Sequence, residues 1–228
     1  GSSSSILTGG GGTDLTQSAG HVKRAETTSE KPKKMNEADL KAEQARLDSQ
    51  RIKALQAKID ALITENPRLN EYKSQIRIDV TPDGLQIQIV DDQNRPMFDT
   101  GSALVKPHMR DILQTIGKAM GKVENRITLS GHTDATPYGS GDRGYSNWEL
   151  SADRANASRR DLVAGGLPDD KLVRVEGLAS SRLLHPDRPQ DPSNRRISIV
   201  IMTREAEERM LPAAIPPVPV PARVIQLV

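Results

Sequence analysis

The spacing of apolar residues changes near residue 70, and this change constrains the fold more than any other feature of the sequence. Before it, apolar residues recur every three or four positions, at Ile52, Leu55, Ile59 and Leu62. That spacing places them on one face of a helix. After it, apolar and polar residues alternate over 76–80 and again over 85–89, as they do in half-buried strands. Residues 81–84, Thr-Pro-Asp-Gly, join the two as a turn. The sequence therefore predicts a helix followed by a β-hairpin.

The predicted helix covers residues 36–66. Asn36 can cap its first turn, Asp39 can support that turn, and Pro67 ends the helix. The apolar stripe lasts only two heptads, which is too short for a stable coiled coil. We expect the C-terminal half to dock on the following domain or on a partner helix, and the N-terminal half to be mobile and partly exposed.

Further elements follow the hairpin. Residues 107–120 predict a helix whose inward face is Met109, Ile112, Leu113 and Ile116. Residues 146–162 predict a second helix, which begins with the capping-box spacing of Ser146 and Glu149. Strands are predicted at 126–130, 172–175 and 196–201. The order β-β-α-β-α-β-β indicates an α+β fold (an α/β sandwich). Its helices pack on one face of a mixed β-sheet, and a long helix precedes it.

Composition divides the chain of 228 residues into four parts. Residues 1–35 are rich in Gly, Ser, Thr and Lys, so we expect a tag and flexible linker there. Residues 36–66 are the helical linker, and 76–203 hold most of the apolar residues and form the domain. Residues 204–228 turn charged and then proline-rich, which predicts a disordered tail.

Several classes of function are excluded or disfavoured. The chain has 32 basic and 30 acidic residues, so a nucleic-acid partner is not expected. It has no cysteine, and its four histidines lack zinc-ligand spacing, so we expect neither a metal nor a cofactor. A segment that spans a membrane needs a run of about 18 apolar residues, and this sequence contains no such run.

Arg154 is a charged residue that the helical pattern places among apolar neighbours. On a helical wheel it lies among small and apolar side chains, namely Leu150, Ser151, Ala155, Ser158 and Leu162. A buried guanidinium needs an anionic partner. The partner could be Asp134, in a structural ion pair, or the carboxylate of a ligand held by two parallel hydrogen bonds. The wheel does not decide between them.

The residues disfavour three possible enzymatic or metal sites. Ser130, His132 and Asp134 alternate on one strand, but such residues lie about 6.6 Å apart, whereas a nucleophile and its base need roughly 3 Å. A metal site at His132 and Asp134 has too few ligands. A glycosidase pair of Asp134 and Glu149 is weakened because Glu149 is explained as a helix cap. We therefore expect no enzyme.

Three motifs in order carry a resemblance to a known family. They are Gly131-His132-Thr133-Asp134, then Asn147-x-x-Leu150-Ser151-x-x-Arg154-Ala155, then Asn194-Arg195-Arg196. Together they resemble the OmpA-like peptidoglycan-binding domain, over about residues 76–203. Within this family, the strings at 94–98 and 144–151 look most like the periplasmic region of MotB-type subunits of the flagellar motor stator.

The resemblance implies a ligand and a site. The ligand would be the diaminopimelate side chain of the peptidoglycan stem peptide. Asp134 would pair with its ammonium and Arg154 with its carboxylate, while backbone N–H groups near Thr133 and at the start of the second helix would add donors. Asn147 and Leu150 would shape the pocket. Arg195 or Arg196 would brace Asp134 or face the glycan.

The same resemblance implies a role in bacterial motility and chemotaxis. The chain would anchor the stator complex non-covalently to peptidoglycan, as a homodimer beside a MotA-type subunit. It would be the periplasmic region of a single-pass protein of the cell inner membrane, whose proton-conducting transmembrane helix we expect upstream of this sequence. Two alternatives remain: an OmpA-family envelope linker such as a porin tail or lipoprotein, and a cell-wall hydrolase.

Overall fold

The structure, a computed structural model, describes residues 36–139 and 144–211. The predicted linker at 1–35 and the proline-rich part of the tail at 212–228 lie outside the described residues. Within the described ranges, no helix has both the length and the hydrophobicity needed to cross a membrane.

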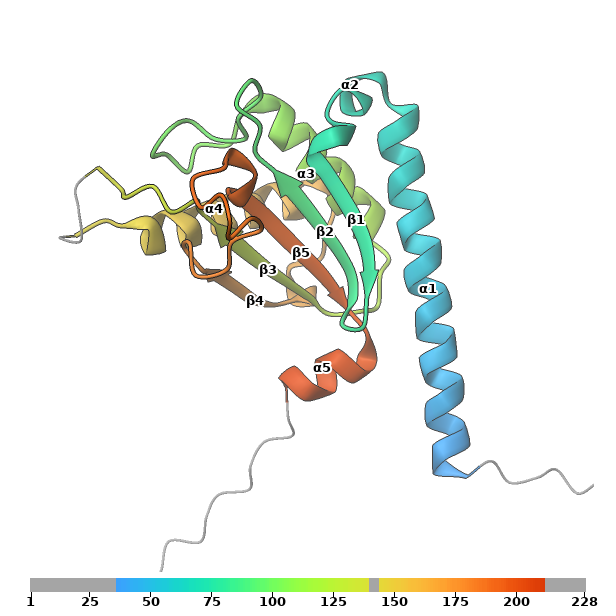
Figure 1. Cartoon of the computed structure of the whole chain (residues 1–228). Helices are drawn as coiled ribbons and strands as arrows, with labels where there is room; N and C mark the ends of the chain where they lie inside the picture. Colours follow the sequence, from blue (N-terminus) through green and yellow to red (C-terminus); the bar gives the residue numbers. More distant parts are fainter. Residues whose placement is uncertain (1–35, 140–143, 212–228) are drawn as a thin grey trace, which may run out of the picture. The chain divides into compact units, whose positions relative to one another are not determined.

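One five-stranded mixed sheet forms the centre of the fold (Figure 1). Its strands are β1 (Ile76–Thr81), β2 (Gly84–Val90), β3 (Ile127–His132), β4 (Leu172–Gly177) and β5 (Arg196–Met202). They lie in the order β1-β2-β5-β3-β4, and only the β3–β4 pair is parallel. The predicted hairpin is confirmed, because Ile76 pairs with Ile89 and Thr81 with Gly84.

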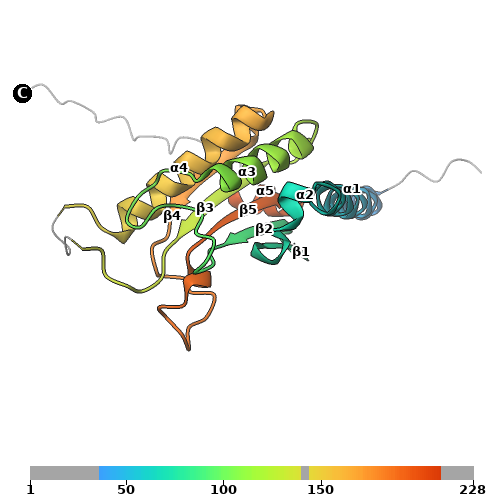
Figure 2. The same cartoon turned by 90° about the horizontal axis from the view of Figure 1, so that it is seen from above.

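Two helices cover one face of this sheet. They are α3 (Pro107–Met120) and α4 (Asn147–Gly165), and Figure 2 shows both on the same side of the strands. The inward face predicted for α3 is buried, and the capping box of α4 is present. Apolar side chains of the central strands fill the space below the helices, among them Leu85, Ile87, Leu129, Ile197 and Ile199. The predicted α+β class and element order are confirmed.

The long helix α1 (Glu37–Glu65) runs beside β1 (Figure 1). Asn36 and Asp39 form the capping box that starts it. Its C-terminal half docks on the domain through Ile52, Leu55, Ile59 and Ile63, all of which are buried. Leu62, which was predicted in this stripe, is only partly buried, because the contact follows the 3.6-residue period of a globular helix and not a strict heptad.

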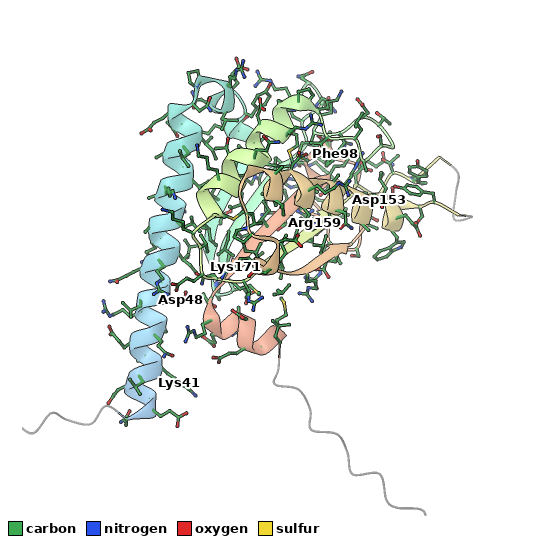
Figure 3. All side chains as sticks on the ribbon, turned by 180° about the vertical axis from the view of Figure 1, so that it is seen from behind. Lys41, Asp48, Phe98, Asp153, Arg159 and Lys171 are labelled. Atoms are coloured by element: carbon green, nitrogen blue, oxygen red, sulfur yellow. The ribbon has the colours of Figure 1, made fainter. Side chains whose placement is uncertain are left out.

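A buried carboxylate holds the middle of α1. Asp48 accepts hydrogen bonds from the Asn125 side chain at 2.8 Å and from the backbone N–H of Arg204 at 2.7 Å. It points from α1 toward the domain, whereas Lys41 lies on the exposed N-terminal part (Figure 3). Leu40 and Leu47 on that part are exposed.

Short helices complete the described fold. They are α2 (Pro67–Asn70), the 3-10 helices η1 (Lys73–Gln75), η2 (Asp169–Lys171) and η3 (Pro192–Asn194), and α5 (Arg204–Met210). The prediction of disorder from residue 204 is wrong for α5. Thr203 caps it, Ala206 is buried, and Arg209 pairs with Asp83 at 2.8 Å, so a charged segment gains enough contacts to fold.

Candidate functional site

The main cavity of interest lies where β2, β3 and α4 converge. It has a volume of about 550 Å³ and is lined by loop 96–101, by residues 133–139 and by the first turns of α4. Six of the seven predicted site residues line it: Thr133, Asp134, Asn147, Leu150, Arg154 and Arg195. The fold therefore brings together residues from three separate sequence motifs.

Asp134 lies just after β3 and is 5% exposed. Its Oδ1 accepts the backbone N–H of Thr136 at 2.9 Å, and its Oδ2 accepts Nη1 of Arg195 at 2.6 Å. Arg195 also donates from Nε to Oδ2 of Asp91 at 2.8 Å. Burial opposes the charged form of Arg195, but its hydrogen bonds to Asp91 and Asp134 outweigh this and raise its pKa. Arg195 is therefore the arginine that braces Asp134.

Arg154 is bound by backbone carbonyls. Its Nε donates to the carbonyl of Ser102 at 2.8 Å and its Nη2 to that of Asp99 at 3.2 Å. Its guanidinium also lies 4.9 Å from the ring centroid of Phe98, a residue that Figure 3 shows beside α4. The predicted alternative of an Arg154–Asp134 ion pair is wrong, because Asp134 is taken by Arg195 and the loop after Phe98 folds over the guanidinium.

The charge of Arg154 is left uncompensated at close range. Among residues 36–139 and 144–211, no carboxylate lies within 4.0 Å of its nitrogens. The side chain is only 6% exposed. Burial lowers the pKa of Arg154, and the charge of Asp91 opposes this lowering. A guanidinium with neutral partners at the wall of a cavity suits an anionic ligand.

The start of α4 forms another wall. Asn147 donates from Nδ2 to the carbonyl of Thr136 at 2.8 Å, which ties α4 to the segment after β3. Leu150 is buried, one turn along. The carboxylate of Glu149 binds Ser146 within the capping box, and these hydrogen bonds lower its pKa. The prediction that Glu149 caps the start of α4 is confirmed.

Thr133 enters the cavity differently from the way we expected. Its backbone N–H donates to the carbonyl of Ala179 at 2.9 Å, so this group is not a free donor for a ligand. Its side chain is 3% exposed, and Oγ1 has no hydrogen-bond partner among the described residues. The hydroxyl of Thr133, and not its amide, is therefore the group left over.

Arg196 does not line the cavity. It donates to Oε1 of Gln88 at 3.0 Å and to the carbonyls of Asn194 and Arg182 at 3.1 and 2.9 Å. Burial, followed by the charge of Arg77, lowers its pKa to about 10. The expectation that either arginine could serve is therefore corrected: consecutive residues of extended backbone project to opposite sides, and only Arg195 projects into the cavity.

Several residues that line the cavity were not predicted, and three of them make contacts that shape it. Asp91 follows β2 directly, Phe98 packs on Arg154, and Tyr138 donates its hydroxyl to the carbonyl of Gly101 at 3.1 Å. The Tyr138–Gly101 bond joins the two loops that border the cavity. An acidic residue directly after an alternating strand was the available sequence cue for Asp91. Phe98 was noted only within a family-like string.

The strand that leads to Asp134 carries one contact that sequence spacing did not foresee. Ser130 Oγ lies 3.3 Å from Nε2 of His132, so the expectation that these side chains are out of reach is wrong: their side chains lean toward each other along the strand. A triad is still not formed, because Asp134 is held by Arg195 and Thr136. The Nδ1 of His132 is buried without a partner among the described residues. Nor do those residues bring together three side chains that could hold a metal.

His132 gives the protein a predicted pH dependence. Burial, followed by the charges of Arg196 and Arg182, lowers its pKa from 6.5 to about 3. In the unfolded chain His132 takes up a proton near pH 6.5, but in the folded chain it does not, so stability should fall as the pH drops from about 6.5 toward 3. The contribution approaches about 1.4 kcal/mol per pH unit.

Urea unfolding across this pH range would measure the effect, with the non-titrating variant His132→Gln as control. We expect the variant to lose stability less steeply than the parent below about pH 6.5. Equal slopes for the two proteins would contradict the assignment to His132.

Comparison with known proteins identifies the domain. Residues 97–196 match the model of the OmpA family. The chain contains an OmpA family domain. It is 47% identical over 202 residues to "Motility protein B" of Escherichia coli strain K12. The aligned region covers 89% of this chain and 62% of that protein. It is 38% identical over 138 residues to the "Putative truncated flagellar export/assembly protein LafU" of the same strain, covering 60% of this chain and 64% of that protein.

The fold of the OmpA domain is also found in a solved structure. The crystal structure of a putative MotB-like protein from Desulfovibrio vulgaris matches with a TM-score of 0.58 and 20% identity, over 72% of this chain and 96% of that one. The predicted resemblance to the OmpA family and to MotB-type proteins is therefore confirmed. The chain spans less than two thirds of the length of the two curated relatives named above.

Proposed function

We propose that this chain anchors the stator complex of a bacterial flagellar motor to peptidoglycan by non-covalent binding. Its OmpA domain and its 47% identity to Motility protein B support this role over that of a general envelope linker. By the same resemblance, it acts in the periplasm as a homodimer, beside a MotA-type subunit, as part of an inner-membrane protein. It works by binding and not by catalysis.

The proposed ligand is the diaminopimelate side chain of the stem peptide. The observation that carries this proposal is that Asp134 and Arg154 line one cavity without pairing with each other, and that the hydrogen-bond partners of Arg154 among the described residues are neutral carbonyls. Diaminopimelate ends in an ammonium and a carboxylate on one carbon. An anion and a planar cation in the same cavity complement these two charges, and the guanidinium can bind the carboxylate through two parallel hydrogen bonds. Asp134 would accept hydrogen bonds from the ammonium.

Binding to insoluble peptidoglycan tests the site. We expect the parent chain to sediment with sacculi, and Asp134→Asn and Arg154→Met each to bind at least about 30-fold more weakly, the cost of losing one partner of a buried charge pair. Matched controls come from an exposed ion pair, Arg159 with Asp169 at 2.9 Å; Arg159 is labelled on α4 in Figure 3. Arg159→Met and Asp169→Asn should bind like the parent. Site variants that bind as tightly as these controls would refute the assignment.

The motor role needs a separate test. A chimera in which this chain replaces the matching region of E. coli Motility protein B should restore swimming to cells that lack that protein. The same chimera with Arg154→Met should not restore it. If the chimera is inserted in the membrane and binds sacculi but the cells do not swim, the stator role is wrong even though the peptidoglycan site stands.

A further inference from the structure

We propose that Asp91 is a positioning residue that holds both charged groups of the cavity, Asp134 and Arg154, in place. The inference rests on the proposed function, because it concerns the same ligand site. Asp91 follows β2 directly and is 8% exposed, and none of the sequence motifs that predicted the site includes it.

One oxygen of Asp91 acts toward Asp134. Oδ2 accepts Nε of Arg195 at 2.8 Å, and Nη1 of the same guanidinium donates to Asp134 at 2.6 Å. A guanidinium is planar and rigid, so fixing its Nε edge also fixes the direction of Nη1. Asp134 is therefore held in position through Arg195 by a carboxylate that follows a different strand, β2.

The other oxygen of Asp91 acts toward Arg154. Oδ1 accepts the backbone N–H of Met97 at 2.6 Å, which fixes the chain where loop 97–102 begins. The next residue, Phe98, packs on the Arg154 guanidinium, and the carbonyls of Asp99 and Ser102 accept its hydrogen bonds. The loop that orients Arg154 therefore starts from a bond to Asp91.

Electrostatics agrees with this geometry. Burial lowers the pKa of Arg154, and nearby carboxylates oppose this lowering. The charge of Asp91 has a larger effect on this pKa than the charge of Asp134. Two carboxylates and two guanidiniums balance the formal charge of the cavity. Through its bonds to Met97 and Arg195, Asp91 orients the groups that are proposed to touch the ligand, and this positioning is the part that we assign to it.

The variant Asp91→Asn tests the proposal through sacculus binding. Asparagine can still accept from Met97 through its carbonyl, but its amide cannot accept from Arg195. We expect binding about tenfold weaker than that of the parent, at temperatures where both are folded by circular dichroism. The control is Asp92→Asn, because this adjacent carboxylate only accepts from Asn94 N–H at 2.9 Å, a bond that asparagine can also make. It should bind like the parent.

A double-mutant cycle separates positioning from direct contact. A residue that acts through Asp134 and Arg154 loses part of its effect when either is already changed. We expect Asp91→Asn to cost about tenfold in the parent but only about threefold in the Asp134→Asn or Arg154→Met background. The same tenfold loss in all three backgrounds would make Asp91 an independent ligand contact and would overturn the proposal.

Asp91→Glu keeps the proposal testable if Asp91→Asn does not fold. Glutamate retains the charge but moves the carboxylate by one methylene. A positioning role therefore predicts weaker binding, whereas a requirement for charge alone predicts binding as tight as that of the parent. Binding of Asp91→Glu at the level of the parent overturns the inference and leaves the proposed function intact. If the parent itself does not bind sacculi, the proposed function fails instead.

Discussion

Arg195→Met is expected to lower the free energy of unfolding by about 3 kcal/mol, because it removes the shared partner of two buried carboxylates. Asp91 and Asp134 both pair with this one guanidinium, at 2.8 and 2.6 Å, and both side chains are less than 10% exposed. Without Arg195, two like charges stay in a low-dielectric region with only backbone donors. Urea unfolding monitored by circular dichroism, with slopes compared between variants, measures the loss.

Arg154→Met is the matched control, since it removes the other arginine of the same cavity. It breaks no ion pair that the described residues make, and the methionine still packs on Phe98. We expect the free energy of unfolding to change by less than about 1 kcal/mol, because the cost of burying a charge is removed along with its hydrogen bonds. Equal losses for the two variants would show that Arg154 also has a structural anionic partner, and would weaken its assignment as the ligand cation.

Gly131→Ala is expected to be as damaging as Arg195→Met, for a steric reason. A Cβ at Gly131 in β3 would lie 2.1 Å from the carbonyl oxygen of Ser151 in α4, so a backbone has to move. Overpacking of this kind costs about 3 kcal/mol at its upper range, which corresponds to about 10 °C in the melting temperature of a domain this size. Because α4 carries Arg154 and β3 leads to Asp134, sacculus binding should weaken as well.

The control for Gly131→Ala is Gly139→Ala, an identical change beside the same cavity. Among the described residues, a Cβ at Gly139 would meet nothing within 4 Å. Thermal unfolding of Gly139→Ala should match that of the parent within about 0.5 kcal/mol. If Gly131→Ala has the same melting temperature as Gly139→Ala, the close approach of α4 to β3 is not a constraint on the fold.

Much of the fold could be predicted from the sequence because its determinants are local. The bounds of α3, the caps at Asn36 and Ser146 and the hairpin turn depend on residues a few positions apart, and all were found. The α5 helix was missed because it depends on distant contacts, such as that between Arg209 and Asp83. No alternation or apolar run announces such contacts.

The site was predicted less completely, and for a physical reason. Family-like motifs pointed to six residues that do line the cavity, but they could not tell Arg195 from Arg196, because the choice depends on where the strand begins. The partners of Arg154 are backbone carbonyls, which every sequence contains and no side chain marks. The reach between Ser130 and His132 depends on side-chain rotamers, which strand spacing alone does not give.

The hold on Arg154 by main-chain oxygens has a consequence for how this site can diverge among relatives. Because the carbonyls of Asp99 and Ser102 accept the hydrogen bonds, the contacts to Arg154 do not themselves require a particular side chain at either position. The number of residues between Phe98 and Ser102 is another matter, since an insertion or deletion there would move both carbonyls away from the guanidinium. For the hydrogen bonds to Arg154, the length of this loop should therefore be the constrained property.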